Sequence, residues 1–141
     1  MWFKKNLKRL SISLILSVSA GVSAEVQVDN AWVRLLPPMS KMTAAYMSLK
    51  SDQDDRLIAA SSELARVVEI HQSKMHDGVM SMQQVGALSL PKDQTVELKP
   101  QSYHLMVMGL TMPLKEGDVH TFILEFEQAG KVEVKIPVRN P

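Results

Sequence analysis

The sequence predicts an all-β domain built as a sandwich or a barrel, and three observations support this class. Short segments with an apolar residue at every second position recur along the chain, which is the periodicity of half-buried strands. Pro and Gly separate these segments, and no long stretch repeats with the 3.6-residue period of a helix. The 141 residues are 45% hydrophobic and 22% charged, which is typical of one globular domain.

The first 24 residues have the three parts of a secretory signal peptide. The N-terminal ten carry four Lys or Arg and no acid, and an apolar, serine-containing stretch leads to small residues before a cut. An uncleaved membrane anchor is the alternative, but Leu10 to Val22 is only 13 residues with four serines. A spanning helix needs about 20 apolar residues. We therefore predict cleavage after Ala24, no stable membrane insertion, and an exported domain of residues 25–141.

The first three expected strands follow from breaks in the sequence. Val26–Leu36 begins with apolar residues at alternate positions and stops at Pro37-Pro38. Thr43–Leu49 and Arg56–Ala60 lie on either side of the polar segment 51–55, which predicts a turn.

The next two expected strands form a hairpin, and three more complete the set. Arg66–Ser73 and Val79–Val85 are separated by His76-Asp77-Gly78, in which Asp-Gly is a signal for a tight hairpin turn. The last three segments are strongly apolar or alternating: Tyr103–Leu110, Val119–Phe126 and Val132–Val138. Eight short strands at regular spacing indicate a sandwich or a barrel.

Charge and cysteine content exclude several classes of function. The signal segment holds four of the 16 Lys and Arg residues and none of the 15 Asp and Glu residues. Residues 25–141 therefore carry 12 basic and 15 acidic side chains, which gives a net charge of −3. A mildly acidic domain without a basic cluster is a poor binder of nucleic acid. The chain has no cysteine, which excludes disulfides, thiolate metal sites and a cysteine nucleophile. Methionine is abundant instead, with 10 residues.

Histidine and methionine share one face of an expected strand. Within Tyr103–Leu110, a period of two puts His104, Met106 and Met108 on one face and Leu105 on the other. An imidazole and a thioether two residues apart can converge on one ion, and further donors must come from another strand.

The expected hairpin supplies such donors in either of two registers. A turn at His76-Asp77 sets His71 directly opposite Met82, whereas a turn at Asp77-Gly78 makes them diagonal neighbours. Both registers place the two side chains on one face, with Cβ atoms roughly 4.5–8 Å apart. An intervening register would send Met82 to the opposite face. Met80 shares the face of Met82 and is a spare thioether.

The candidate site is therefore one metal ion held by His71, Met82, His104 and Met106. Thioether sulfur is a soft, neutral donor that suits Cu(I) and Ag(I) and offers little to Zn²⁺, Mg²⁺ or Ca²⁺. Four neutral donors predict one Cu(I) ion.

Each of these residues also has an ordinary structural interpretation. A methionine in a strand usually fills a gap in the core, and a lone histidine is more often a satisfied residue than a ligand. We expect His76 and His120 to be solvated. We expect core or loop positions for Met39, Met42 and Met47. For Met108 and Met112 a role at the lip of the site or behind its ligands is the less favoured alternative to an ordinary structural role.

The spacing of the four candidate donors resembles the signature of a known family. The sequence reads H-x10-M-x21-H-x-M from His71 to Met106, as in the periplasmic copper chaperones of the PCu(A)C family. Flanking segments are similar along most of residues 25–141: Ala31-Trp32-Val33-Arg34, Ala44-Ala45-Tyr46-Met47, Gly78-Val79-Met80-Ser81-Met82, His104-Leu105-Met106-Val107-Met108-Gly109-Leu110 and Leu114-Lys115-Glu116-Gly117-Asp118.

The resemblance implies a cupredoxin-like Greek-key β-barrel in the periplasm that binds one Cu(I). It also implies delivery of copper towards the Cu-A centre of cytochrome c oxidase, alone or with a Sco-type assembly protein. We expect a carrier that is not an enzyme and that works as a monomer, although the sequence does not fix the oligomeric state. The sequence departs from the family at Gln101-Ser102, where glycines are frequent, and this concerns turn geometry. It ends at Pro141 without the His/Met-rich tail of some members, so no second Cu(II) site is expected there.

Three other functions compete with that of a copper carrier. A blue-copper electron-transfer protein needs a cysteine thiolate, which is absent. A hydrolase would need a Ser/His/acid set or a close carboxylate pair, and none stands out. A secreted β-sandwich interaction module without a metal, whose methionines are core, is the strongest alternative.

Overall fold

The computed structural model describes residues 24–141, and these form ten strands and no helix. This part of the chain accordingly contains no apolar helix long enough to cross a membrane. The predicted signal segment lies outside the described residues except for Ala24. The strands, in chain order, are β1 (Val26–Arg34), β2 (Met42–Ser51), β3 (Asp55–Ser62), β4 (Ala65–His76), β5 (Val79–Gln84), β6 (Leu88–Leu90), β7 (Thr95–Leu98), β8 (Tyr103–Leu110), β9 (Val119–Phe126) and β10 (Gly130–Arg139).

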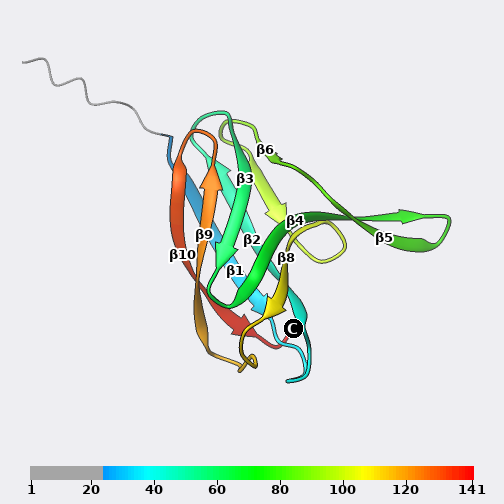
Figure 1. The fold of residues 1–141 in the computed structure, drawn as a ribbon. Coiled ribbons are helices and arrows are strands. Elements are labelled where there is room, and N and C mark those ends of the chain that lie inside the picture. The colour runs from blue at the N-terminus through cyan, green and yellow to red at the C-terminus, as the bar shows by residue number, and fades with distance from the viewer. Residues whose placement is uncertain (1–23) are drawn as a thin grey trace, which may run out of the picture.

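Seven of these strands close into a barrel. They follow one another in the order β4-β8-β2-β1-β10-β9-β3, and β3 returns to β4 through the pair Ala60–Val68. The short strands β6 and β7 pair with β3 and β2, and β5 pairs with β4 outside the barrel. Figure 1 shows the barrel strands side by side around a common axis. The all-β class predicted from the sequence is confirmed.

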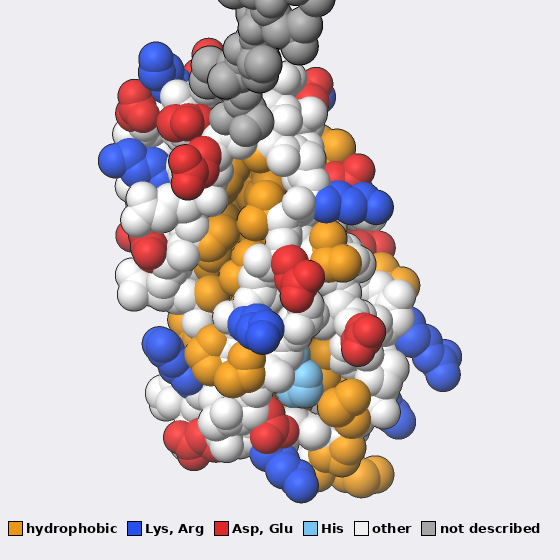
Figure 2. All heavy atoms as spheres, turned by 90° about the vertical axis from the view of Figure 1, so that its left-hand side faces the viewer, with side chains coloured by type: hydrophobic (Ala, Val, Ile, Leu, Met, Phe, Trp, Pro, Cys, Tyr) orange, Lys and Arg blue, Asp and Glu red, His pale blue; other side chains and the backbone are white. Residues whose placement is uncertain are grey.

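Strands β1 and β10 meet only at one end. They pair in parallel at Val33–Val138 and Arg34–Arg139, whereas most neighbouring strands pair over longer antiparallel ladders. Beyond this short seam, Val28 and Val134 are only partly buried against the core. Figure 2 looks onto the side of the barrel where β10 lies and shows a strip of hydrophobic side chains bordered by charges of both signs.

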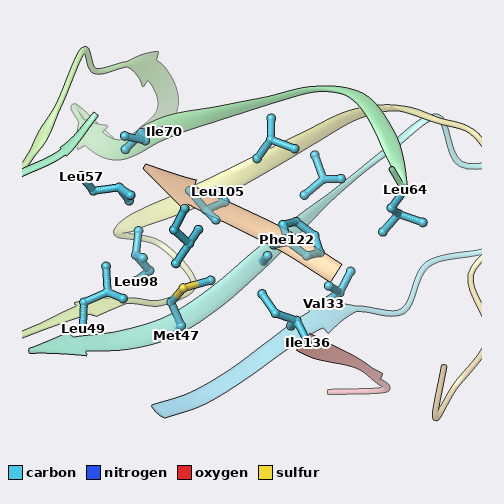
Figure 3. Packing of buried hydrophobic residues seen from close by; sticks show 14 of the residues in the cluster. Val33, Met47, Leu49, Leu57, Leu64, Ile70, Leu98, Leu105, Phe122 and Ile136 are labelled. Carbon is cyan, nitrogen blue, oxygen red and sulfur yellow. The ribbon is translucent and has the colours of Figure 1, made fainter. Parts of the chain in front are cut away.

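The barrel interior is filled by alternate residues from all its strands. Leu105, Phe122, Val33 and Ile136 are fully buried, and Met47 is 2% exposed. Figure 3 shows these side chains converging between the strands, with the sulfur of Met47 among carbon atoms. Burying each such side chain stabilises the fold by roughly 1.5–3 kcal/mol. The alternation therefore assigns one face of every barrel strand to the core and leaves the other face for the site.

The structure adds two strands that the sequence analysis missed. β6 and β7 have only three and four residues, too few for an alternating pattern to stand out. The core nevertheless uses Leu88, Leu90 and Leu98 from them. β4 also extends beyond the predicted Ser73 as far as His76.

The hairpin of β4 and β5 projects from the barrel (Figure 1). Every residue of β5 is exposed. The turn consists of Asp77 and Gly78, both with positive φ (48° and 76°), which is the geometry of the hairpin turns that Asp-Gly favours. His71 lies opposite Gln84 and Ser73 opposite Met82. Of the two predicted registers, the hairpin therefore has the one in which His71 and Met82 are diagonal neighbours.

Candidate metal centre

His71 and His104 lie directly opposite each other on adjacent strands. They form a cross-strand pair between β4 and β8, and their ring centroids are 6.0 Å apart. His104 is 3% exposed, and the side chain of His71 is 15% exposed. Since Ile70 and Leu105, their neighbours in the chain, point into the core, the two imidazoles stand on the outer side of the barrel wall.

One nitrogen of each imidazole is fixed by an acceptor oxygen. Nε2 of His71 donates to Oε2 of Glu69 at 2.9 Å, and Nδ1 of His104 donates to the carbonyl oxygen of Ser102 at 3.0 Å. Because an ionised carboxylate and a carbonyl can only accept, both contacted nitrogens carry the proton in the neutral rings. Metal-binding histidines commonly have this arrangement, which orients the ring.

The other nitrogen of each imidazole has no partner. Nδ1 of His71 and Nε2 of His104 are buried and make no hydrogen bond. A buried polar atom without a partner costs roughly 1–3 kcal/mol, so two of them on facing rings require an explanation. Each carries a lone pair in the tautomer fixed by its neighbour. This is the donor chemistry that a metal ion needs.

The two candidate thioethers lie on the same face as the imidazoles. Met106 is two residues after His104 on β8 and pairs with Glu69 of β4. Met82 is on β5, paired with Ser73, two residues along the same face from His71. Met106 is half-buried, whereas Met82 is 56% exposed. We call His71, Met82, His104 and Met106 the donor face.

Two aromatic rings continue the row of imidazoles along the barrel wall. Tyr46 of β2 lies beside His104, with ring centroids 6.5 Å apart. Trp32 of β1 packs against Tyr46, with ring centroids 4.7 Å apart and the ring planes inclined by 42°. Tyr46 is 6% exposed. These rings shield His104 from water on the side away from His71. Sequence reasoning assigned Trp32 and Tyr46 no role, because their proximity to His104 depends on pairing between distant strands.

Two more residues of the site were missed, and one could have been found. Glu69 is two positions before His71, so the period of the strand already puts both on one face. Ser102 could not be found, because its backbone carbonyl is the contact. That carbonyl also accepts from the amide of Ser73 at 3.1 Å. The preceding Gln101 has a φ of 66°, a conformation that glycine adopts without strain, so the departure from the family pattern leaves the turn in place.

The remaining histidines and methionines divide between surface and interior. His76 is exposed at the hairpin turn, as expected. His120 was expected to be solvated, but its Nε2 is buried without a partner, because β9 packs it beside Ile136 of β10. Met47 is core and Met39 is exposed in a loop, as expected. Met42 is neither, since it is an exposed strand residue that pairs with Met108.

Carboxylates do not supply an alternative centre in residues 24–141. No group of three or more His, Cys, Asp or Glu side chains there could hold a metal ion. The two imidazoles and the thioethers beside them remain the candidate donors in this part of the chain.

A family model and a curated relative match almost the whole described domain. The model of the LpqE-like family, which is described as "Putative lipoprotein LpqE-like", matches residues 26–138. The chain belongs to this family. A relative in Leifsonia xyli subsp. xyli (strain CTCB07), named "Putative lipoprotein Lxx21020", is 30% identical over 118 residues, covering 82% of this chain and 70% of the relative.

Solved structures identify the fold of this LpqE-like protein. The copper-bound PCuAC domain from PmoF2 is 23% identical, with a TM-score of 0.70 over 84% of this chain and 96% of that domain. The solution structure of CuI-DR1885 from Deinococcus radiodurans is 30% identical, with a TM-score of 0.66 over 86% of this chain and 83% of that one. The predicted resemblance to the PCuAC domains and the predicted cupredoxin-like barrel are thereby confirmed.

Proposed function

We propose that this protein is an exported copper chaperone that binds one Cu(I) ion through His71, Met82, His104 and Met106. The observation that carries the proposal is the pair of facing imidazoles, each with a buried, unpartnered nitrogen. Its support from relatives is that CuI-DR1885 and the PmoF2 domain are described as copper-bound.

The donor set explains the choice of ion. Two imidazoles and two thioethers are neutral, so an ion bound there keeps a single positive charge when it is Cu(I) and two when it is Zn²⁺. Soft sulfur donors favour Cu(I) and Ag(I) over Zn²⁺. The proposed role is that of a carrier, because it requires only that the ion be held and passed on by ligand exchange.

The proposed location is the periplasm, after cleavage behind Ala24. The relatives' lipoprotein names accord with export. The present sequence has no cysteine to which a lipid could be attached. The proposed acceptor is the Cu-A centre of cytochrome c oxidase, alone or with a Sco-type assembly protein, and the proposed working form is a monomer.

Competition with a Cu(I) chelator under anaerobic conditions tests the binding. The parent should remove one equivalent of Cu(I) from the chelator and leave Zn²⁺ with a zinc indicator. His71→Ala should weaken Cu(I) binding by about 100-fold or more, beyond what the loss of a residue that only orients a ligand costs. His76→Ala is the matched control, since His76 is on the same strand and points to the other side of the hairpin.

Equal copper binding by the parent, His71→Ala and His76→Ala would reject the site, and a parent that takes no Cu(I) from the chelator would favour a metal-free interaction module. Transfer to the acceptor is tested separately. The Cu(I)-loaded protein should load an apo Cu-A domain, and retention of the copper by the carrier would reject the proposed delivery while leaving the binding intact.

A further inference from the structure

The end of the β4–β5 hairpin carries a pair of methionines that the donor face does not use. Met75 lies directly opposite Met80 in the ladder, and the two are 63% and 41% exposed. Directly opposed residues have Cβ atoms roughly 4.5–5.5 Å apart. The Asp77-Gly78 turn fixes this register, because it lies one ladder pair beyond the methionines.

The two methionines are on the same side of the hairpin as the donor face. From the turn towards the barrel, this side presents Met75–Met80, then Ser73–Met82, then His71–Gln84. Successive pairs on one side are about 6.6–6.8 Å apart along a strand. Thioethers therefore lead step by step from the exposed end of the hairpin to the imidazoles.

The surroundings of this pair favour a soft monovalent cation. The other hairpin side chains on this side, Ser73 and Gln84, are neutral. Lys74 points to the opposite side, and Asp77 lies in the turn beside His76, at 3.4 Å between Oδ2 and Nε2. Each methionine has three rotatable side-chain bonds, so two opposed sulfurs can converge on one ion. Binding by thioethers releases no proton.

We propose that Met75 and Met80 form a second, weaker site for Cu(I) or Ag(I), through which an ion is loaded onto Met82 and then onto the imidazoles. The proposal rests on the proposed function in taking Cu(I) as the cargo. The ion stays Cu(I) throughout, since the sulfur of Met82 adds as a sulfur at the hairpin end leaves. With two exposed donors and no imidazole, this site fills after the donor face and exchanges its ion rapidly.

Methyl NMR of the full exported domain, labelled with ¹³C at the methionine methyl groups, reads the two sites separately. Ag(I) is the probe, because it is redox-stable and has the same ligand preference. The first equivalent should shift the methyl signals of Met82 and Met106 in slow exchange. Further Ag(I) should then shift Met75 and Met80 in fast exchange.

Paired variants test both the second site and its role in loading. Met75→Leu/Met80→Leu should abolish the second phase and leave the first phase and the Ag(I) affinity of the donor face unchanged. In stopped-flow mixing, the same double variant should load the donor face several-fold more slowly than the parent. Met39→Leu, which removes a methionine that is 85% exposed in a loop, is the control and should change neither result.

The possible failures are distinguishable. If Met75 and Met80 do not respond while Met82 and Met106 do, the second site is rejected and the proposed function stands. If none of the four responds, the proposed function fails as well. A second phase that survives the double variant, or loading at the parent rate in that variant, overturns the loading proposal.

Discussion

Met47 and Met80 are the same residue type in opposite environments of one small barrel. Met47 is 2% exposed among aliphatic side chains in the interior, and Met80 is 41% exposed on a strand with no buried residue. In the interior, a methionine contributes through its shape and the apolar area that it buries. On the hairpin it buries little, so what it can offer is its sulfur atom. The position of each methionine in the sheet, and not its residue type, therefore decides whether it serves as a packing residue or is available as a sulfur donor.

Replacing each of these two methionines by alanine should give the largest difference between the two environments, measured as the change in the free energy of unfolding. Met47→Ala should lower the free energy of unfolding by about 2–5 kcal/mol, because it leaves a cavity in a closed core. Met80→Ala should change it by no more than about 0.5 kcal/mol, as expected for an exposed position. Urea denaturation of the metal-free proteins measures both. Similar losses would mean that the hairpin methionines are packed.

Leucine at the donor face should remove the sulfur and keep the shape. Met82→Leu and Met106→Leu should each weaken Cu(I) binding by more than about tenfold, while the cost in stability stays below about 1.5 kcal/mol. Chelator competition and thermal melts of the metal-free variants measure the two effects. Met47→Leu is the control, because it makes the same change in the core and should leave Cu(I) affinity unchanged. If both donor-face variants bound copper as tightly as the parent, Met82 and Met106 would be packing residues and not ligands.

Removing the carboxylate of Glu69, which contacts His71, should weaken Cu(I) binding less than the loss of a ligand does. Glu69→Gln keeps an acceptor oxygen near Nε2 of His71 but loses the carboxylate that strengthens the imidazole as a donor. Loss of such a partner typically costs 10–100-fold in metal affinity, and we expect about tenfold. The control is Glu133→Gln, an equivalent change at an exposed position of β10. Equal affinities for the two variants would show that Glu69 does not act through His71.

The features of the fold and of the candidate site that could be predicted from the sequence are those that depend on residues close together in the chain. Tyr103–Leu110 and Val119–Phe126 were predicted with the bounds that the structure has, because alternation and turn residues mark both ends. The common face of His104 and Met106 follows from the same period. The direct opposition of His71 and His104 could not be predicted, since the register of two distant strands is set by how the core packs. The strand Leu88–Leu90 was missed because three residues carry no period.

The smallest expected effect concerns an ion pair between Arg56 of β3 and Glu127 in the turn after β9. Nε of Arg56 donates to Oε2 of Glu127 at 2.6 Å, with both side chains largely exposed. This hydrogen bond, together with the charge of Arg56, lowers the pKa of Glu127 in the folded state. The stabilisation is therefore present above the unfolded pKa of a glutamate, about 4.3, and is lost as the pH falls through the folded pKa.

Arg56→Gln tests this pair without touching the donor face. At neutral pH it should lower the melting temperature slightly, and the difference from the parent should decrease as the pH falls below the unfolded pKa of a glutamate and shrink in high salt. Cu(I) affinity should not change. A difference that does not change with pH or salt would show that Arg56 acts through packing of its side chain and not through its charge.

The barrel wall has two short seams, with two paired positions between β1 and β10 and one between β3 and β4. Two paired positions join strands from the two ends of the domain, whereas β4 and β8 share a ladder from Ala65 to Gln72. Backbone amides at the seam should therefore exchange with deuterium through brief unrolling of the wall, and those of the β4–β8 ladder only when the whole domain unfolds. Strand β2 separates the seam from β8 on one side, and β9 and β3 separate it from β4 on the other. Opening at the β1–β10 seam would therefore leave the β4–β8 ladder and both imidazoles in place, so an ion held there could stay bound while that part of the wall separates.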